Sequence, residues 1–143
     1  MKREKNLASK TKRNNQLTGN VGLYYVCYLL SRKKWNVLPT SRNAKGVDIL
    51  IYSQNLSRRY AIQVKSLSKR NAINIGKSNK PLPDYLVVCR KVWDDKPPEV
   101  FVMSFDDAKT MVEEKGKTKK SYWLQYKDYE KFRDDMCKRI GNG

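Results

Sequence analysis

The chain has 143 residues, and its 31 Lys and Arg against 14 Asp and Glu give a net charge of +17 at pH 7. This length suits one domain with a single core, and no apolar run approaches the roughly 20 residues of a membrane span. The charged first residues precede no apolar segment, so no secretory signal is expected. The absence of His and the wide separation of Cys27, Cys89 and Cys137 argue against a zinc site or His-based catalysis. They indicate reduced, structural thiols in a cytoplasmic protein.

The positive charge is unevenly distributed along the chain. Residues 1–80 hold 18 basic residues against two acidic ones, a net +16, whereas residues 81–143 hold 13 against 12. Such a field favours a polyanionic partner, and nucleic acid is the obvious one. The alternative is a basic surface that only keeps the protein soluble.

Hydrophobic periodicity and turn residues predict a flexible basic arm followed by one α/β domain over residues 17–143. The arm covers residues 1–16. The domain begins with an amphipathic helix over residues 17–34, in which Gly22 indicates close approach of another element. The remaining elements are strands at 35–38, 47–52, 60–65, 84–90, 99–103 and 122–124, a helix over 104–115, and a last helix from Asp128 that buries Tyr129, Phe132, Met136 and Ile140.

The segments 47–52 and 60–65 are rich in branched and aromatic residues and are joined by a polar turn, which predicts a β-hairpin. Side chains alternate between the two faces of a strand, so Gln63 and Lys65 share one face. A hairpin that closes symmetrically places Asp48 opposite Gln63, with Lys65 beside them. A carboxylate, an amide and an ammonium group at the end of a buried hairpin indicate a functional site.

The pattern of Gly46, Asp48, Gln63 and Lys65, with Val64 between the last two, resembles the PD-(D/E)XK nuclease superfamily. The resemblance is to the variant with Gln in the (D/E)XK element, as in Mrr-type restriction endonucleases, and the overall plan is similar to archaeal Holliday junction resolvases. It covers about residues 17 to 105. It implies a restriction-endonuclease-like core, in which a mixed central sheet of about five strands is flanked by an N-terminal helix and C-terminal helices.

The resemblance also implies a metal-dependent DNA endonuclease. Side-chain oxygens of Asp48 and Gln63 and the backbone carbonyl of Val64 would hold one weakly bound Mg²⁺ or Mn²⁺, and Lys65 would position the attacking water. The substrate would be duplex or branched DNA, and cutting both strands with so small a nuclease implies a homodimer. Basic residues near the site are candidates for contacts to nucleic acid: Arg42, Lys45, Lys69, Arg70 and Lys77.

Two departures from the family pattern keep other functions open. The first helix of the family commonly carries a Glu that joins the metal site, but residues 17–34 contain no acid and offer Leu23 instead. The family usually has a helix after the Lys strand, whereas residues 66–80 suggest a short strand. One alternative is a DNA-binding protein on the same fold that does not cut. Another is an RNA-binding domain that stacks bases on its tyrosines, although five of the nine tyrosines lie at positions typical of a core.

Overall fold

The computed structural model describes residues 2–41, 46–76, 83–115, 122–134 and 138–143. None of the helices in these ranges combines the length and the apolar character needed to cross a membrane. In chain order the elements are α1 (Lys2–Arg32), β1 (Asn36–Pro39), β2 (Ile49–Tyr52), β3 (Arg59–Leu67), β4 (Ile73–Asn74), β5 (Tyr85–Arg90), β6 (Glu99–Ser104), α2 (Phe105–Lys115), β7 (Trp123–Leu124), α3 (Tyr126–Tyr129) and a 3₁₀ turn (Glu130–Phe132).

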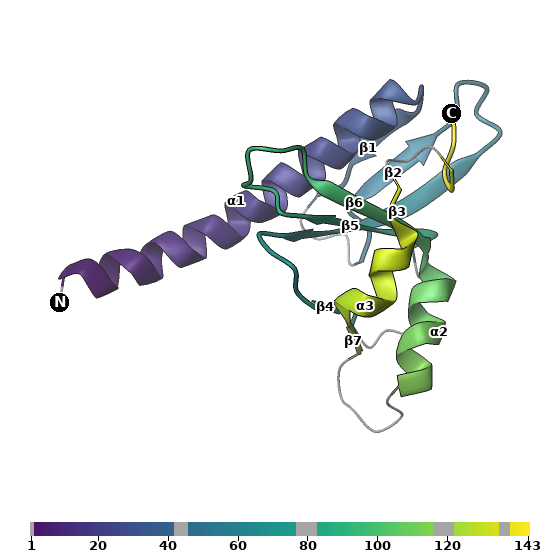
Figure 1. Cartoon of the computed structure of the whole chain (residues 1–143). Helices are drawn as coiled ribbons and strands as arrows, with labels where there is room; N and C mark the ends of the chain where they lie inside the picture. The colour runs from purple at the N-terminus through teal and green to yellow at the C-terminus, as the bar shows by residue number, and fades with distance from the viewer. Residues whose placement is uncertain (1, 42–45, 77–82, 116–121, 135–137) are drawn as a thin grey trace.

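A mixed five-stranded sheet in the order β1-β2-β3-β5-β6 forms the centre of the molecule (Figure 1). Strand β2 runs antiparallel to both β1 and β3, β5 runs parallel to β3, and β6 is antiparallel to β5. Strand β4 pairs instead with β7 in a separate two-stranded sheet. The predicted α/β class, the sheet of about five strands and the short strand after Lys65 are therefore confirmed.

Helix α1 packs across one face of the sheet through its C-terminal half (Figure 1). Buried Val26 and Leu30 join a cluster with apolar side chains of the sheet. At Gly22 the helix comes so close to β3 that an added Cβ would lie 1.8 Å from the Ser66 hydroxyl oxygen. The close approach predicted at this glycine is confirmed, and only a residue without a side chain fits there.

The opposite face of the sheet is covered only in part. Helices α2 and α3 and the β4–β7 pair form a second core cluster with inward-facing residues of β5 and β6, among them Leu86 and Phe101. No described residue covers the same face of β1 and β2 in this way, and Leu38 and Leu50 are 51% and 45% exposed. The candidate site lies at the border of the covered part, because Gln63 and Lys65 pair with Leu86 and Val88 of the second cluster and Asp48 precedes β2.

The helix α1 begins at Lys2, well before the start expected at residue 17, and its N-terminal half projects beyond the sheet (Figure 1). No Gly or Pro interrupts residues 2–18, and Lys, Arg, Gln and Ala are good helix formers. The role of this basic segment as an arm that follows a phosphate backbone stays a prediction.

The last helix is shorter than predicted, because regular helical structure ends at Phe132. Arg133 adopts an extended conformation and forms a β-bridge with Phe101 of β6. Tyr129, Phe132 and Ile140 are buried as expected, whereas Met136 lies outside the described residues. A tertiary contact to the sheet edge thus overrides the helical spacing of the sequence.

Candidate functional site

Asp48 lies just before β2 and is bound to β3 through both its backbone and its side chain. Its N–H donates to the carbonyl of Ile62 at 2.9 Å, and its carboxylate Oδ2 accepts the N–H of Val64 at 2.7 Å. These two bonds lie on either side of Gln63. The β2–β3 register, in which Ile49 pairs with Ile62, continues by one step to place Asp48 opposite Gln63. The predicted juxtaposition of these two residues is therefore present.

Gln63 presents an amide oxygen that is buried and accepts no hydrogen bond from any described residue. Such groups are rare in folded proteins, because a buried acceptor without a donor retains its full cost of desolvation. An amide oxygen is also a good ligand for a hard divalent cation. This unsatisfied oxygen, on the residue opposite Asp48, is the most informative feature of the site.

Lys65 follows two residues later on the same strand and is half-buried. Burial lowers the pKa of its ammonium group, and the nearby Asp48 carboxylate opposes that shift by favouring the charged form. Alternation along β3 puts Gln63 and Lys65 on one face. Their neighbours Ile62, Val64 and Ser66 face α1 instead. The three predicted site residues are thus brought together on the face away from α1.

The donor set fits one hard divalent cation held by oxygen atoms. Asp48 offers a carboxylate and Gln63 an unsatisfied amide oxygen. The N–H of Val64 points toward Asp48, and in a strand the C=O of a residue points to the same side as its N–H. The Val64 carbonyl therefore also points toward Asp48, just beyond the last residue pair of the β2–β3 ladder. Among the described residues no three His, Cys, Asp or Glu side chains gather into a metal-binding group. With one formal negative charge, the site would bind Mg²⁺ or Mn²⁺ weakly.

Helix α1 supplies no acid to this site. Leu23, which stands where the family pattern has a Glu, is partly buried and packs into the apolar cluster beneath the sheet. The helix lies across the opposite face, where Gly22 meets Ser66. The missing ligand therefore reflects the packing of α1 as well as the residue type.

Two of the predicted nucleic-acid contacts, Lys69 and Arg70, lie in the described part of the chain just after β3. Lys69 is exposed just after β3. Arg70 is bonded to Glu130 at 2.5 and 3.0 Å and lies 3.9 Å above the Tyr126 ring, so its guanidinium group is partly engaged within the protein. Three of the predicted residues lie outside the described part of the chain, namely Arg42, Lys45 and Lys77.

A second carboxylate, which sequence reasoning missed, accepts a hydrogen bond from β3 on the other side of that strand. Asp84 lies just before β5, and its Oδ2 accepts the N–H of Ala61 at 2.7 Å. This bond has the same length and kind as the bond from Val64 to Asp48. We therefore regard Asp84 as a structural counterpart of Asp48.

A cluster of ion pairs was also missed by sequence reasoning. Buried Arg90 contacts Glu99 at 3.1 Å and Glu130 at 2.7 Å, and Arg133 contacts Glu99 at 2.7 Å. Burial raises the pKa of the Glu99 carboxyl, but hydrogen bonds from its basic neighbours outweigh this effect and lower the pKa to about 2. The sequence carries a signal for the first pair, since Arg90 ends one strand and Glu99 begins the next and the two are opposite in the ladder. The cluster ties the C-terminal segment to the sheet.

Comparison with known proteins adds no identification to this geometry. No family model, no curated protein sequence and no solved structure matches the chain.

Proposed function

We propose that this chain is a metal-dependent DNA endonuclease with Asp48, Gln63 and Lys65 as its reaction centre. The observation that carries the proposal is the buried Oε1 of Gln63, the residue opposite Asp48, because this oxygen accepts no hydrogen bond from the described residues. A protein gains nothing in stability from an unsatisfied buried oxygen, so a ligand is the natural reason to keep it.

The arrangement of elements supports a restriction-endonuclease-like core. A long helix precedes three strands that alternate in direction. Asp48 lies just before the second of them, Gln63 and Lys65 lie on the third, and the next strand of the sheet is parallel to the third. This is the order in which the resemblance places its site. The described part of the connection from β3 to β5 holds the short strand β4 in place of a helix.

The chemistry follows from the three side chains. A bound Mg²⁺ or Mn²⁺ would neutralise charge on the scissile phosphate and lower the pKa of a bound water. Asp48 and Gln63 would hold the cation, and the hydrogen bond from Val64 fixes the carboxylate of Asp48 against β3. Lys65, held close to that carboxylate, would orient the attacking water and stabilise the negative charge that develops on the phosphate.

The basic first half of the chain supports DNA as the substrate. Residues 1–80 carry a net charge of +16, and they include α1 and the strands that bear the site. A phosphate backbone attracted by this field would come within reach of the cation that Asp48 and Gln63 would hold.

A second candidate function is DNA binding without cleavage on the same fold. The observation that favours it is the single carboxylate at the site together with a first helix that contributes none. Weak cation binding would then leave a basic surface as the functional part of the molecule.

The two functions are separated by a matched pair of variants, Asp48→Asn and Asp84→Asn. Each removes one negative charge and keeps an oxygen that can accept the 2.7 Å bond from β3. Linear, supercoiled and four-way-junction DNA would be incubated with Mg²⁺ or Mn²⁺ and each protein. We expect Asp48→Asn to lose nicking while retaining or slightly strengthening DNA binding, and Asp84→Asn to nick as the wild type does.

The readout also covers the outcomes that oppose the proposal. Nicking that survives in Asp48→Asn would remove the assigned site. Tight binding with no cleavage by the wild type under either metal would establish the second function. Lys65→Gln should abolish nicking while the protein still binds Mn²⁺, measured by electron paramagnetic resonance, because lysine is not among the ligands.

A further inference from the structure

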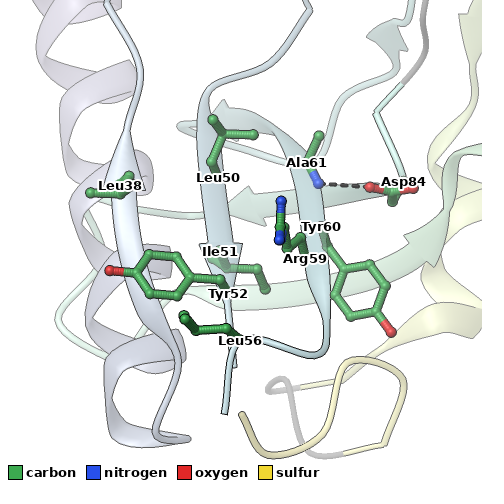
Figure 2. Close-up of a pocket in the computed structure, with 9 residues that line it drawn as sticks. All are labelled: Leu38, Leu50, Ile51, Tyr52, Leu56, Arg59, Tyr60, Ala61 and Asp84. Carbon is green, nitrogen blue, oxygen red and sulfur yellow. Dashed lines mark hydrogen bonds between the residues drawn. The ribbon is translucent and has the colours of Figure 1, made fainter. Parts of the chain in front are cut away.

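The uncovered face of the sheet bears an apolar groove of about 640 Å³ beside the candidate site. Figure 2 shows the side chains of Leu38, Leu50, Tyr52 and Leu56 gathered over β1, β2 and the turn that follows β2. Leu56 is 59% exposed and Leu38 51%. Exposed apolar patches of this kind on a soluble protein mark interaction surfaces.

Among the described residues, the charges that line the groove balance on a strongly basic protein. Within that part of the chain the only charged lining residues are Arg59 and Asp84, and no described lysine contributes to the lining. Arg59 forms no ion pair within the described part of the chain. A phosphate backbone selects clusters of cations rather than leucines. The groove therefore suits a protein surface that is apolar and carries both signs of charge.

We propose that a second copy of this chain docks symmetrically on the groove. In a two-fold interface the same patch meets itself, so Arg59 of one copy faces Asp84 of the other, and each Leu56 enters the groove of its partner. The patch supplies both members of that ion pair. It also supplies the apolar projection, Leu56, and the groove that receives it. Self-association at this surface also brings together a part of a +17 protein whose described charges balance.

The position of the groove relates the interface to the reaction centre. Leu50 lies two residues from Asp48, and Ala61 two residues from Gln63, which corresponds to about 7 Å along each strand. Two candidate sites would therefore flank the interface, an arrangement suited to cutting two strands. This last step rests on the proposed function, whereas the interface itself does not.

Leu56 permits a test that does not depend on weakening the fold. Its backbone has a φ of 62°, a left-handed conformation that Asn adopts more readily than Leu. Leu56→Asn should therefore match or exceed the wild type in thermal stability while it loses the exposed apolar projection. Leu17→Asn is the control, because Leu17 is 48% exposed on α1, away from the groove.

Sedimentation velocity without metal or DNA measures the dimer directly. We expect the wild type and Leu17→Asn to dimerise, more strongly as salt rises because repulsion between basic copies is screened, and Leu56→Asn to remain monomeric. Arg59→Glu and Asp84→Arg should each be monomeric alone and should form a mixed dimer when combined, because both interface ion pairs are then restored. A monomeric wild type throughout the salt series, or equal dimerisation of the two Asn variants, would overturn the proposal. If the wild type is monomeric and Leu56→Asn binds DNA more weakly than the wild type does, the groove is a nucleic-acid surface. Docking of a second copy is then excluded.

Discussion

Replacing Gln63 by Met asks whether the buried amide oxygen is kept for a ligand or for folding. Met has a similar length and removes the polar atom that accepts no hydrogen bond among the described residues. A buried polar group without a partner costs about 1–3 kcal/mol. The thioether fits the same space imperfectly, so we expect a net gain of about 1–2 kcal/mol in the free energy of unfolding without metal. For a chain of this size that raises Tm by about 3–8 °C.

The assay is thermal unfolding, first in EDTA and then over a series of Mn²⁺ concentrations. A cation that binds only the folded state raises Tm with concentration, and this rise should be present in the wild type and absent in Gln63→Met. Gln54→Met is the control, because the Gln54 amide donates to the carbonyl of Lys34 at 2.6 Å on the surface. The control should lose at most about 1 kcal/mol and keep the response to Mn²⁺.

Two results would refute this reasoning. A Gln63→Met protein that is less stable than the wild type in EDTA would mean that the amide oxygen has a structural partner. An equal Mn²⁺ response in both proteins would mean that Gln63 is not a ligand, whatever its effect on stability.

Three further predictions concern packing, pH and salt. Gly22→Ala should lower the free energy of unfolding, measured in urea, by about 1–3 kcal/mol, because its Cβ would lie 1.8 Å from the Ser66 oxygen. Adding Ser66→Gly should restore part of that free energy. A Gly22→Ala protein as stable as the wild type would contradict the contact. Glu99 and Glu130 have pKa values of about 2 against the usual 4.5, so the stability from their ion pairs is present above about pH 5 and lost as the pH falls toward 2. Glu99→Gln should flatten the Tm profile in that window. Affinity for duplex DNA should fall about 10³-fold between about 50 and 200 mM salt for about six phosphate contacts, and a flat response in a filter-binding assay would exclude the basic half as the binding surface.

The hairpin and the site residues follow from local sequence rules. Branched and aromatic residues on both sides of a polar turn define β2 and β3, and alternation then places Asp48 opposite Gln63 without knowledge of the rest of the chain. The cap of α2 is equally local, because Ser104 accepts the N–H of Asp107 at 3.1 Å as its sequence position predicts.

Features that depend on distant packing were not predictable in this way. Arg133 leaves the helical pattern because β6 offers it a bridge at Phe101, and no property of the sequence near Arg133 indicates that contact. The unsatisfied state of the Gln63 oxygen depends on which donors surround it in space. The exposure of Leu38 depends on where α2 and α3 stop covering the sheet.

Helix α1 has a kinetic consequence for the encounter with any polyanion. Its 31 residues correspond to about 46 Å, and residues 2–13, with six basic residues and one acidic residue, take up about 18 Å of that length. Since the Debye length at physiological salt is about 8 Å, a basic segment whose helical backbone extends beyond the sheet carries the protein's field to distances at which charges on the domain body are already screened. Shortening the rod would therefore reduce the capture radius and the association rate more than the lifetime of the complex.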